Sequence, residues 1–407
     1  MKSFMLENNI KVIFHKTSAL KLVAMRIFTS VSVISENRDN SGISYFTQKL
    51  MTQSTQNRPN EILVRDVANI GAKLYGNTEY DVTKITMIFM SKYFHEAVEI
   101  ISDVILNPKF DSKALFFEKQ NVMAVLNSRK DNISEMAHDE FIKMFYGNNT
   151  TYSRTIFGIK ETILKINRTD LIKWHNYSYN NSNILISIVG NINDKIVQSS
   201  LSKYFSRVPD GVKSKNIIFD VKLDKNIKIE IKSKFKQAYI YSGYPACKFG
   251  DQNFIKTSLI SIILGGRMTS RLFVELREKL GLAYEVNTIY PLRISQSYFG
   301  IYMGLDKKNI NTALEKIYEV LKNFRTKKIS ELELLYVKKN IKGNYFLNRE
   351  TVKNKSYYYG FFEIIGQGYE YDFKYLEYIE NITTHDIINI ANEIFSKYSV
   401  NVVICPE

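Results

Sequence analysis

Two short patterns occur twice in this sequence, roughly 200 residues apart. The pattern NTEY at residues 77–80 corresponds to NTIY at residues 287–290, an offset of 210 residues. The pattern IxxxDLI at residues 166–172 corresponds to IxxxDII at residues 382–388, an offset of 216 residues. Because both offsets exceed any solenoid period, the sequence predicts a duplicated domain of about 200 residues.

A segment with a weaker hydrophobic pattern separates the two copies. It runs from about residue 205 to about residue 225 and contains Pro209-Asp210-Gly211 and several closely spaced lysines. Such a composition indicates a linker, so we expect a first domain over residues 1–212 and a second over residues 213–407. The chain of 407 residues is long enough for each domain to bury its own core.

The net charge of +15 does not by itself indicate a nucleic-acid partner. The lysines are scattered through nearly every segment instead of forming one basic tract. A positively charged cleft for acidic peptides stays open as an alternative.

No apolar run reaches the roughly 18 residues of a membrane span. The first residues lack a signal-peptide pattern and the two cysteines form no disulfide framework, so we expect a cytoplasmic protein.

The candidate site with the clearest pattern lies in SIILGGRMTSRLFVELREKLGLAYEVNTIY, which ends with the second copy of the first repeated pattern, NTIY. The glycine pair at residues 265–266 predicts the end of one helix, and Ser270 is the expected N-cap of the next. Phe273, Leu276 and Leu280 recur at helical spacing, which predicts one apolar helical face. Gly281 is the expected helix stop.

Beyond Gly281, Tyr284 opens an alternating segment that is typical of a strand. Arg277 lies in the last turns of the predicted helix, so Arg277 and Tyr284 are expected to converge beside the glycine turn. The plainer interpretation is an exposed helix arginine and a half-buried strand tyrosine, and composition alone favours it.

The runs GGRMTSRLF and ELREKLGLAY resemble the second-half signature of the pitrilysin/insulinase zinc metallopeptidases, whose relatives include the subunits of mitochondrial processing peptidase. The resemblance covers both halves of the chain. In that family an arginine and a tyrosine seven residues later lie over the scissile bond. The resemblance implies that Arg277 and Tyr284 have this role here.

Active members of the family carry His-x-x-Glu-His on a helix that corresponds to residues 43–55 of this chain. Two histidines four residues apart hold zinc, and the glutamate activates the zinc-bound water as a general base. This chain has Tyr45, Gln48 and Lys49 at the three positions. A glutamine cannot accept a proton at neutral pH, and a lysine ammonium has no lone pair for a metal.

The third zinc ligand of the family is a glutamate six residues before an Asp-Asn element. That element resembles Asp131-Asn132, which places Val125 at the ligand position and Glu118 at the upstream family glutamate. Valine cannot coordinate zinc. The five histidines of the chain show no i, i+4 pair and no neighbouring cysteine: His15, His95, His138, His175 and His385. We therefore expect no metal and no cofactor in this chain.

The resemblance also implies a substrate-binding strand formed by Tyr75, Gly76, Asn77 and Thr78, at the edge of the first sheet. A peptide substrate can add to such an edge as an extra strand. The expected fold is α+β, with two homologous domains that enclose a cleft. Each domain is expected to have a mostly antiparallel sheet with helices packed on one face.

The leading hypothesis is a non-catalytic subunit of a heterodimeric zinc endopeptidase. Family members of this length act as dimers, in which one subunit holds zinc and the partner supplies the arginine and the tyrosine. The expected partners are a paralogous zinc-bearing chain and a peptide or unfolded-protein substrate. One alternative is a zinc-free peptide-binding or structural protein of the same fold. Another is a homodimer with unrelated hydrolytic chemistry, for which the sequence offers no nucleophile.

Overall fold

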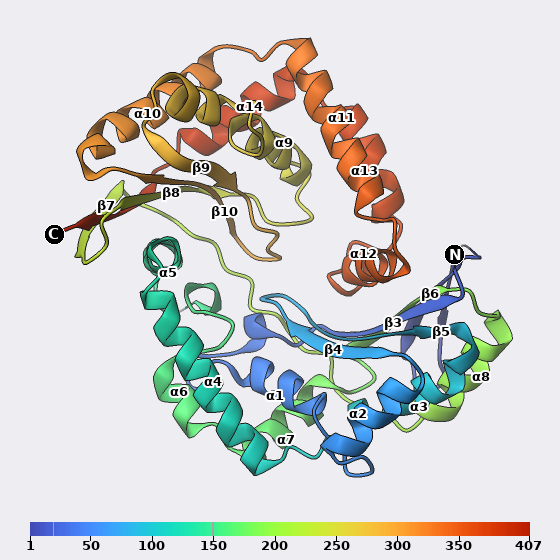
Figure 1. The fold of residues 1–407 in the computed structure, drawn as a ribbon. Coiled ribbons are helices and arrows are strands. Elements are labelled where there is room, and N and C mark those ends of the chain that lie inside the picture. Colours follow the sequence, from blue (N-terminus) through green and yellow to red (C-terminus); the bar gives the residue numbers. More distant parts are fainter. Residues whose placement is uncertain (19, 149) are drawn as a thin grey trace. The chain divides into compact units, whose positions relative to one another are not determined.

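The computed structural model describes residues 1–18, 20–148 and 150–407 (Figure 1). Within these residues the secondary structure forms two β-sheets with helices packed against them, so the fold is α+β as the sequence predicted. Apart from one additional strand in the first sheet, both sheets have the same strand arrangement.

The first sheet has six strands among the described residues, in the order β1-β2-β6-β3-β5-β4. Its strands are β1 (Lys2–Met5), β2 (Lys11–Lys16), β3 (Leu22–Thr29), β4 (Lys73–Thr78), β5 (Thr83–Met90) and β6 (Ile184–Gly190). The pair β2 and β6 is parallel, and the other neighbouring strands are antiparallel. β6 is buried along its whole length and consists mostly of Ile, Leu and Val, as is typical of a central strand.

The second sheet has five strands among the described residues, in the order β7-β11-β8-β10-β9. Its strands are β7 (Ile227–Ser233), β8 (Ala238–Ala246), β9 (Ala283–Ile289), β10 (Ser297–Leu305) and β11 (Val400–Pro406). Here too one pair, β7 and β11, is parallel, and it occupies the place of β2 and β6 in the first sheet. Apart from β1, the two sheets therefore share one topology.

The second repeated sequence pattern lies at the start of two equivalent helices, α7 (Arg168–Ser178) and α14 (Thr384–Phe395). Asn167 and Asp170 form a capping box at the start of α7, and Thr383 and Asp386 form one at the start of α14. In a capping box the N-cap and N3 side chains satisfy each other's backbone N–H groups. The repeat in the sequence therefore conserves a helix start, which is the structural reason for the shared aspartate.

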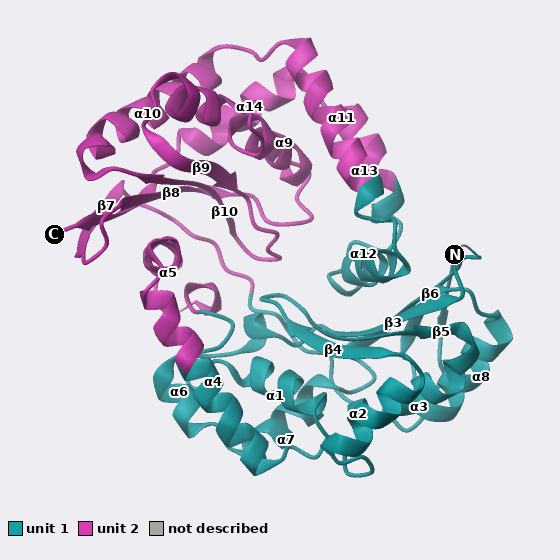
Figure 2. Ribbon diagram, viewed as in Figure 1, with its two compact units in different colours: residues 1–123, 155–217, 346–373 teal, residues 124–154, 218–345, 374–407 magenta. Residues whose placement is uncertain are grey.

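The described residues form two compact units, which Figure 2 colours separately. Unit 1 comprises residues 1–123, 155–217 and 346–373, and unit 2 comprises residues 124–154, 218–345 and 374–407. Helices wholly in unit 1 are α1 (Ile43–Met51), α2 (Asn60–Asn69), α3 (Phe94–Leu106), α6 (Lys160–Lys165), α7, α8 (Asp194–Phe205) and α12 (Val352–Ile364). Helices wholly in unit 2 are α5 (Ile133–Tyr146), α9 (Phe254–Leu264), α10 (Ile310–Thr326) and α14.

The remaining helical segments are short turns or cross the border between the units. The short segments are η1 (Val33–Ser35), η2 (Ser91–Tyr93), η3 (Thr151–Ser153), η4 (Phe273–Lys279) and η5 (Lys307–Asn309). The helices α4 (Ser112–Lys130), α11 (Glu331–Leu347) and α13 (Tyr371–Glu380) contain residues of both units. No helix of the described chain is long and apolar enough to span a membrane.

Each unit also contains a helix that comes from the other half of the sequence. In unit 1, α12 packs on β3 and β6, where a Cβ on Gly360 would lie 2.8 Å from Cδ2 of Phe28. In unit 2, α5 packs on β8 and β11, where a Cβ on Gly243 would lie 2.6 Å from Cε2 of Phe141. Glycine at these two points allows the helix to lie close to the sheet. The helices of the same half cover the opposite face of each sheet, as α1 does in unit 1.

Candidate functional site

Helix α1 carries Tyr45, Gln48 and Lys49, the residues predicted from the sequence to occupy the zinc-motif positions, and a buried carboxylate fixes its first turn. Glu36 accepts hydrogen bonds from the backbone N–H of Gly42, at 2.8 Å, and of Ser44, at 2.9 Å. These N–H groups have no partner within the helix, and a negative charge at a helix N-terminus is favourable. The cap therefore sets the direction in which the α1 side chains project.

The Tyr45 side chain makes a hydrogen bond within the protein. Its hydroxyl donates to Oε1 of Glu118 on α4 at 2.7 Å, and the Glu118 side chain is buried. The edge of the ring packs against Phe46 and Phe157. Burial, followed by the hydrogen bond to Glu118, raises the pKa of Tyr45, so the hydroxyl stays protonated and donates at neutral pH. This hydrogen bond joins α1 to α4 in unit 1.

Gln48 is buried and faces the edge strand β4, where a glycine leaves space for its amide. A Cβ added to Gly76 would lie 2.5 Å from Cδ and 2.9 Å from Cγ of Gln48. Lys49, one residue later, is only partly exposed. Position 48 therefore fills a gap in the packing between helix and strand, and an amide there cannot serve as a general base.

The predicted substrate strand lies at the edge of the first sheet, in β4. Among the described residues, β4 pairs with β5 on one side only, with Gly76 opposite Ile85 and Asn77 opposite Lys84. Thr78 is buried at the end of the strand, and Asn77 is exposed. The Lys353 ammonium lies 5.5 Å from the centre of the Tyr75 ring. The outer edge of β4 offers backbone groups to which an extended peptide can bind.

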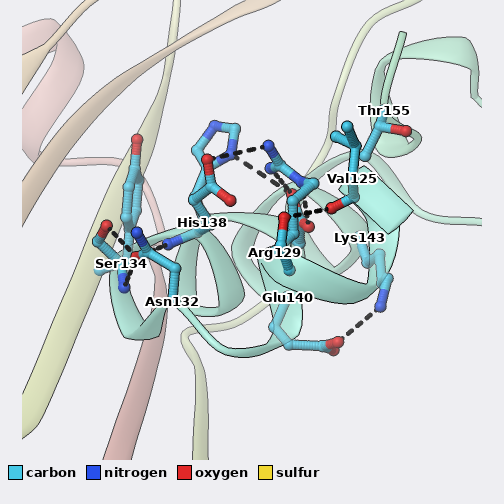
Figure 3. Close-up of polar contacts among 12 residues, drawn as sticks. Val125, Arg129, Asn132, Ser134, His138, Glu140, Lys143 and Thr155 are labelled. Atoms are coloured by element: carbon cyan, nitrogen blue, oxygen red, sulfur yellow. Dashed lines mark hydrogen bonds and ion pairs between the residues drawn. The ribbon is translucent and has the colours of Figure 1, made fainter. Parts of the chain in front are cut away.

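Val125 lies on α4 seven residues after Glu118, so the two residues share one face of that helix. It is 40% exposed, and its backbone carbonyl accepts a hydrogen bond from the Ser128 hydroxyl at 2.9 Å (Figure 3). Just beyond, Arg129 makes two hydrogen bonds to the Asp139 carboxylate, at 2.6 and 3.1 Å. The valine side chain is apolar and has no atom that can coordinate a metal.

Polar side chains along α5 bind one another or the backbone of the helix. Asn132 caps the helix through the backbone N–H groups of Ser134 and Glu135, and Lys143 pairs with Glu140, as Figure 3 shows. Across residues 1–18, 20–148 and 150–407 no group of three or more His, Cys, Asp or Glu side chains has a geometry that could hold a metal ion.

In unit 2, Arg277 lies on a π-helical segment, η4, where the sequence had predicted an ordinary helix. Its guanidinium lies 5.0 Å from the centre of the Phe273 ring. Leu276 is buried as expected, but Leu280 is 45% exposed, so the prediction of one face through Leu280 was wrong. The wider turn of a π-helix rotates residue 280 away from the face that Leu276 sets. Gly281 ends the segment with φ +59°, as the sequence predicted.

Tyr284 lies at a β-bulge in β9. Ala283 pairs with Leu305 and Glu285 pairs with Gly304, so Tyr284 is the extra residue on the edge strand. A bulge disturbs the alternation of side chains and can redirect one of them. Tyr284 and Glu285 are both exposed as a result, although they are neighbours on one strand.

The hydroxyl of Tyr284 has a partner that the sequence analysis missed. It donates to Oδ1 of Asp306 at 2.6 Å, and the Tyr284 side chain is 52% exposed. This hydrogen bond is the main cause of the raised pKa of Tyr284. Asp306 follows β10 directly, and only the pairing register of β9 with β10 brings the two residues together. No spacing in the sequence indicates such a contact.

The two sheets of shared topology indicate a duplicated α+β protein, and family models identify its class. Residues 11–158 match the model described as insulinase, peptidase family M16, and residues 165–341 match the model described as peptidase M16 inactive domain. The chain belongs to the M16 peptidase family.

Several bacterial proteins are similar over long parts of the chain. An uncharacterized zinc protease of Rickettsia felis is 28% identical over 98% of this chain and 96% of its own length. A protein named non-peptidase homolog YmxG, from Helicobacter pylori, is 25% identical over 69% of this chain and 64% of its own length. The structure of a peptidase M16 inactive domain from Pseudomonas fluorescens covers the whole chain with a TM-score of 0.93 at 18% identity.

Proposed function

We propose that this chain is the non-catalytic, substrate-binding subunit of a heterodimeric zinc endopeptidase. In this proposal Arg277 and Tyr284 act in trans, at the zinc site of a paralogous chain. The observation that carries it is that both residues lie on backbone irregularities, a π-helical turn and a β-bulge. Such irregularities cost stability and often occur at functional sites, where they redirect a side chain.

The two side chains have the chemistry that peptide hydrolysis needs at the reacting carbonyl. The guanidinium of Arg277 offers a rigid, planar set of donors for substrate oxygens. The hydroxyl of Tyr284 can donate to the oxyanion that develops at the scissile carbonyl, and such a donor stabilises the transition state more than the substrate.

Unit 1 supports a non-catalytic role in the same complex. The hydrogen bond between Tyr45 and Glu118 and the packing of Gln48 against Gly76 commit these α1 side chains to contacts within unit 1. Zinc and the general base would then come from the partner subunit. The name of the Helicobacter pylori relative, non-peptidase homolog, is in keeping with this assignment.

The substrate in this proposal is a peptide or an unfolded protein that adds as a strand to β4. The backbone of Tyr75, Gly76, Asn77 and Thr78 would pair with it, because β4 is the edge strand of the first sheet. The proposal also includes a first domain over residues 1–212 and a second over residues 213–407. It includes a cytoplasmic location of the protein as well.

A zinc-free peptide-binding or structural protein is the second candidate. It is favoured by one specific observation, the hydrogen bond that already occupies the Tyr284 hydroxyl. In such a protein β4 would still accept a peptide strand, but Arg277 and Tyr284 would have no role in hydrolysis.

The deciding experiment is reconstitution with a paralogue that has an intact His-x-x-Glu-His motif. We expect no stoichiometric zinc and no peptidase activity in this chain alone, and a one-to-one complex that is active.

Arg277→Lys should lower turnover of the complex and leave its zinc content unchanged, because a point charge cannot replace the planar guanidinium. Arg267→Lys, a change outside η4, is the matched control.

If the two chains stay separate at micromolar concentration and neither gains activity, the second candidate replaces the first. One tightly bound zinc ion per isolated chain would contradict both candidates.

A further inference from the structure

The hydrogen bond between Tyr284 and Asp306 restricts what the tyrosine can do in the isolated chain. A tyrosine hydroxyl has one proton to donate, and an ionised carboxylate can only accept. The donor in the 2.6 Å contact must therefore be Tyr284, and its single proton is committed to Asp306. The phenolic oxygen can still accept a hydrogen bond, but an oxyanion needs a donor.

Asp306 is also unusual for an aspartate at a helix start. It is the N-cap residue of η5, which leads directly into α10, and Asp is among the preferred residues there because its carboxylate accepts the first free N–H groups. Within the described residues, the Asp306 side chain makes no such capping bond. Its carboxylate is directed to the neighbouring strand instead, where the bulge places Tyr284.

We propose that Asp306 is a positioning residue that holds the Tyr284 hydroxyl in a resting state and releases it when the substrate carbonyl becomes an oxyanion. This inference rests on the proposed function of Tyr284. No proton is transferred in the exchange, because the hydroxyl changes its acceptor from a carboxylate to an oxyanion. Asp306 therefore competes with the transition state for one donor.

The competition has a direct kinetic consequence. Hydrogen bonds to an ionised acceptor are stronger than neutral ones, so Asp306→Asn weakens the resting contact while it keeps the shape of the side chain. The variant complex should turn over about fivefold faster, the effect of one ordinary net hydrogen bond. KM should stay unchanged, because the resting contact opposes the transition state and not the binding of the peptide.

The test compares five forms of this chain, each reconstituted with the zinc-bearing paralogue: wild type, Asp306→Asn, Asp224→Asn, Tyr284→Phe and the double variant Tyr284→Phe/Asp306→Asn. Asp224→Asn is the charge control, since Asp224 is exposed and lies outside the strands and helices of unit 2. We expect a gain in kcat for Asp306→Asn only. The gain should vanish when Tyr284 is replaced by phenylalanine.

Failure of this inference and failure of the proposed function give different results. A rate for Asp306→Asn that is equal to or below that of wild type overturns the resting-state role, since Asp306 would then be neutral or would orient Tyr284 productively. A rate for Tyr284→Phe equal to wild type overturns the proposed function itself.

In the isolated chain, Asp306→Asn should lower the pKa of one tyrosine, measured by ultraviolet difference titration against the Tyr284→Phe variant. An unchanged titration overturns the inference as well.

Discussion

The contact of α1 with β4 in unit 1 is equivalent to the contact of α9 with β9 in unit 2. The two contacts differ in which element carries the glycine that allows close packing. In each, a helix approaches an edge strand so closely that one partner must be glycine. In unit 1 the glycine is on the strand, Gly76, beneath Gln48. In unit 2 it is at the helix end, where a Cβ on Gly265 would lie 2.5 Å from the backbone nitrogen of Thr288.

The polar groups of the two regions differ in direction. In unit 1, Gln48 is buried and Tyr45 is half-buried, and Glu118 accepts the hydrogen bond from the tyrosine hydroxyl. In unit 2, the bulge turns Tyr284 outward, and α9 is joined to the strand by a separate bond from the Thr288 hydroxyl to the Ser261 carbonyl, at 2.7 Å. One topology therefore supports inward polar contacts in unit 1 and an exposed tyrosine in unit 2.

The largest expected effect is on catalysis and comes from unit 2. Tyr284→Phe removes one donor and keeps the ring, so turnover of the reconstituted complex should fall on the order of 100-fold, or about 3 kcal/mol in activation free energy. The free energy of unfolding should change by less than about 0.5 kcal/mol, because the side chain is exposed. Single-turnover kinetics and chemical denaturation measure the two quantities.

The same substitution in unit 1 is the internal control for that experiment. Tyr45→Phe should leave the turnover of the complex within about twofold of wild type, because Tyr45 has no role in hydrolysis in our proposal. A large loss of turnover from Tyr45→Phe with none from Tyr284→Phe would reverse the functional assignment of the two regions.

The next largest effect concerns the glycine of β4. A Cβ at Gly76 would overlap the buried Gln48 side chain, so Gly76→Ala should lower the free energy of unfolding by about 1–3 kcal/mol, the usual cost of overpacking. The loss should be smaller in a Gln48→Ala background, where the space is free. Urea denaturation of wild type, Gly76→Ala, Gln48→Ala and the double variant measures the coupling energy between the two positions. Strictly additive losses would show that Gln48 does not lie over Gly76.

Sequence patterns anticipated the parts of these regions that depend on local spacing. The repeated Asp170 and Asp386 indicated the duplication because each accepts a hydrogen bond at one fixed position, N3 of a capping box. Gly281 indicated a helix end because only a glycine takes a positive φ at little cost. The α+β fold followed from such signals and from the resemblance to a known family.

The parts that the sequence did not indicate depend on contacts between distant residues. The bond between Tyr284 and Asp306 requires the one-residue shift in the pairing of β9 with β10, which has no local signature. The π-helical turn at Arg277 follows the apolar spacing of an ordinary helix as far as Leu276. The exchange of α5 and α12 between the units likewise depends on tertiary packing and not on the pattern of either helix.

A smaller effect on stability is expected from Tyr45. Tyr45→Phe leaves the buried Glu118 carboxylate without the hydrogen bond from the tyrosine, which should cost about 1–2 kcal/mol of unfolding free energy. Thermal and urea unfolding of the isolated chain, at neutral pH, measure the loss. A variant as stable as wild type would show that water replaces the hydroxyl at no cost.

The pH dependence of that difference has a definite sign. The folded protein raises the pKa of Tyr45, chiefly through burial, and so favours the protonated hydroxyl over the unfolded chain. The contribution of Tyr45 to stability is therefore complete below the ordinary tyrosine pKa of about 10 and declines as the pH rises above it. The stability of wild type and of Tyr45→Phe should converge at high pH, and a difference that widens there contradicts the assignment.

The smallest effect is expected at Gly281, between η4 and β9. Its φ is +59° and a Cβ there would meet no described atom within 4 Å, so Gly281→Ala should cost only backbone strain, about 1 kcal/mol of unfolding free energy. Gly281→Asn should cost less, because asparagine tolerates the left-handed region better than alanine. In contrast to Gly76→Ala, the loss should not depend on any neighbouring side chain. If alanine is as stable as glycine, or asparagine is worse than alanine, the turn between Arg277 and Tyr284 does not have this conformation.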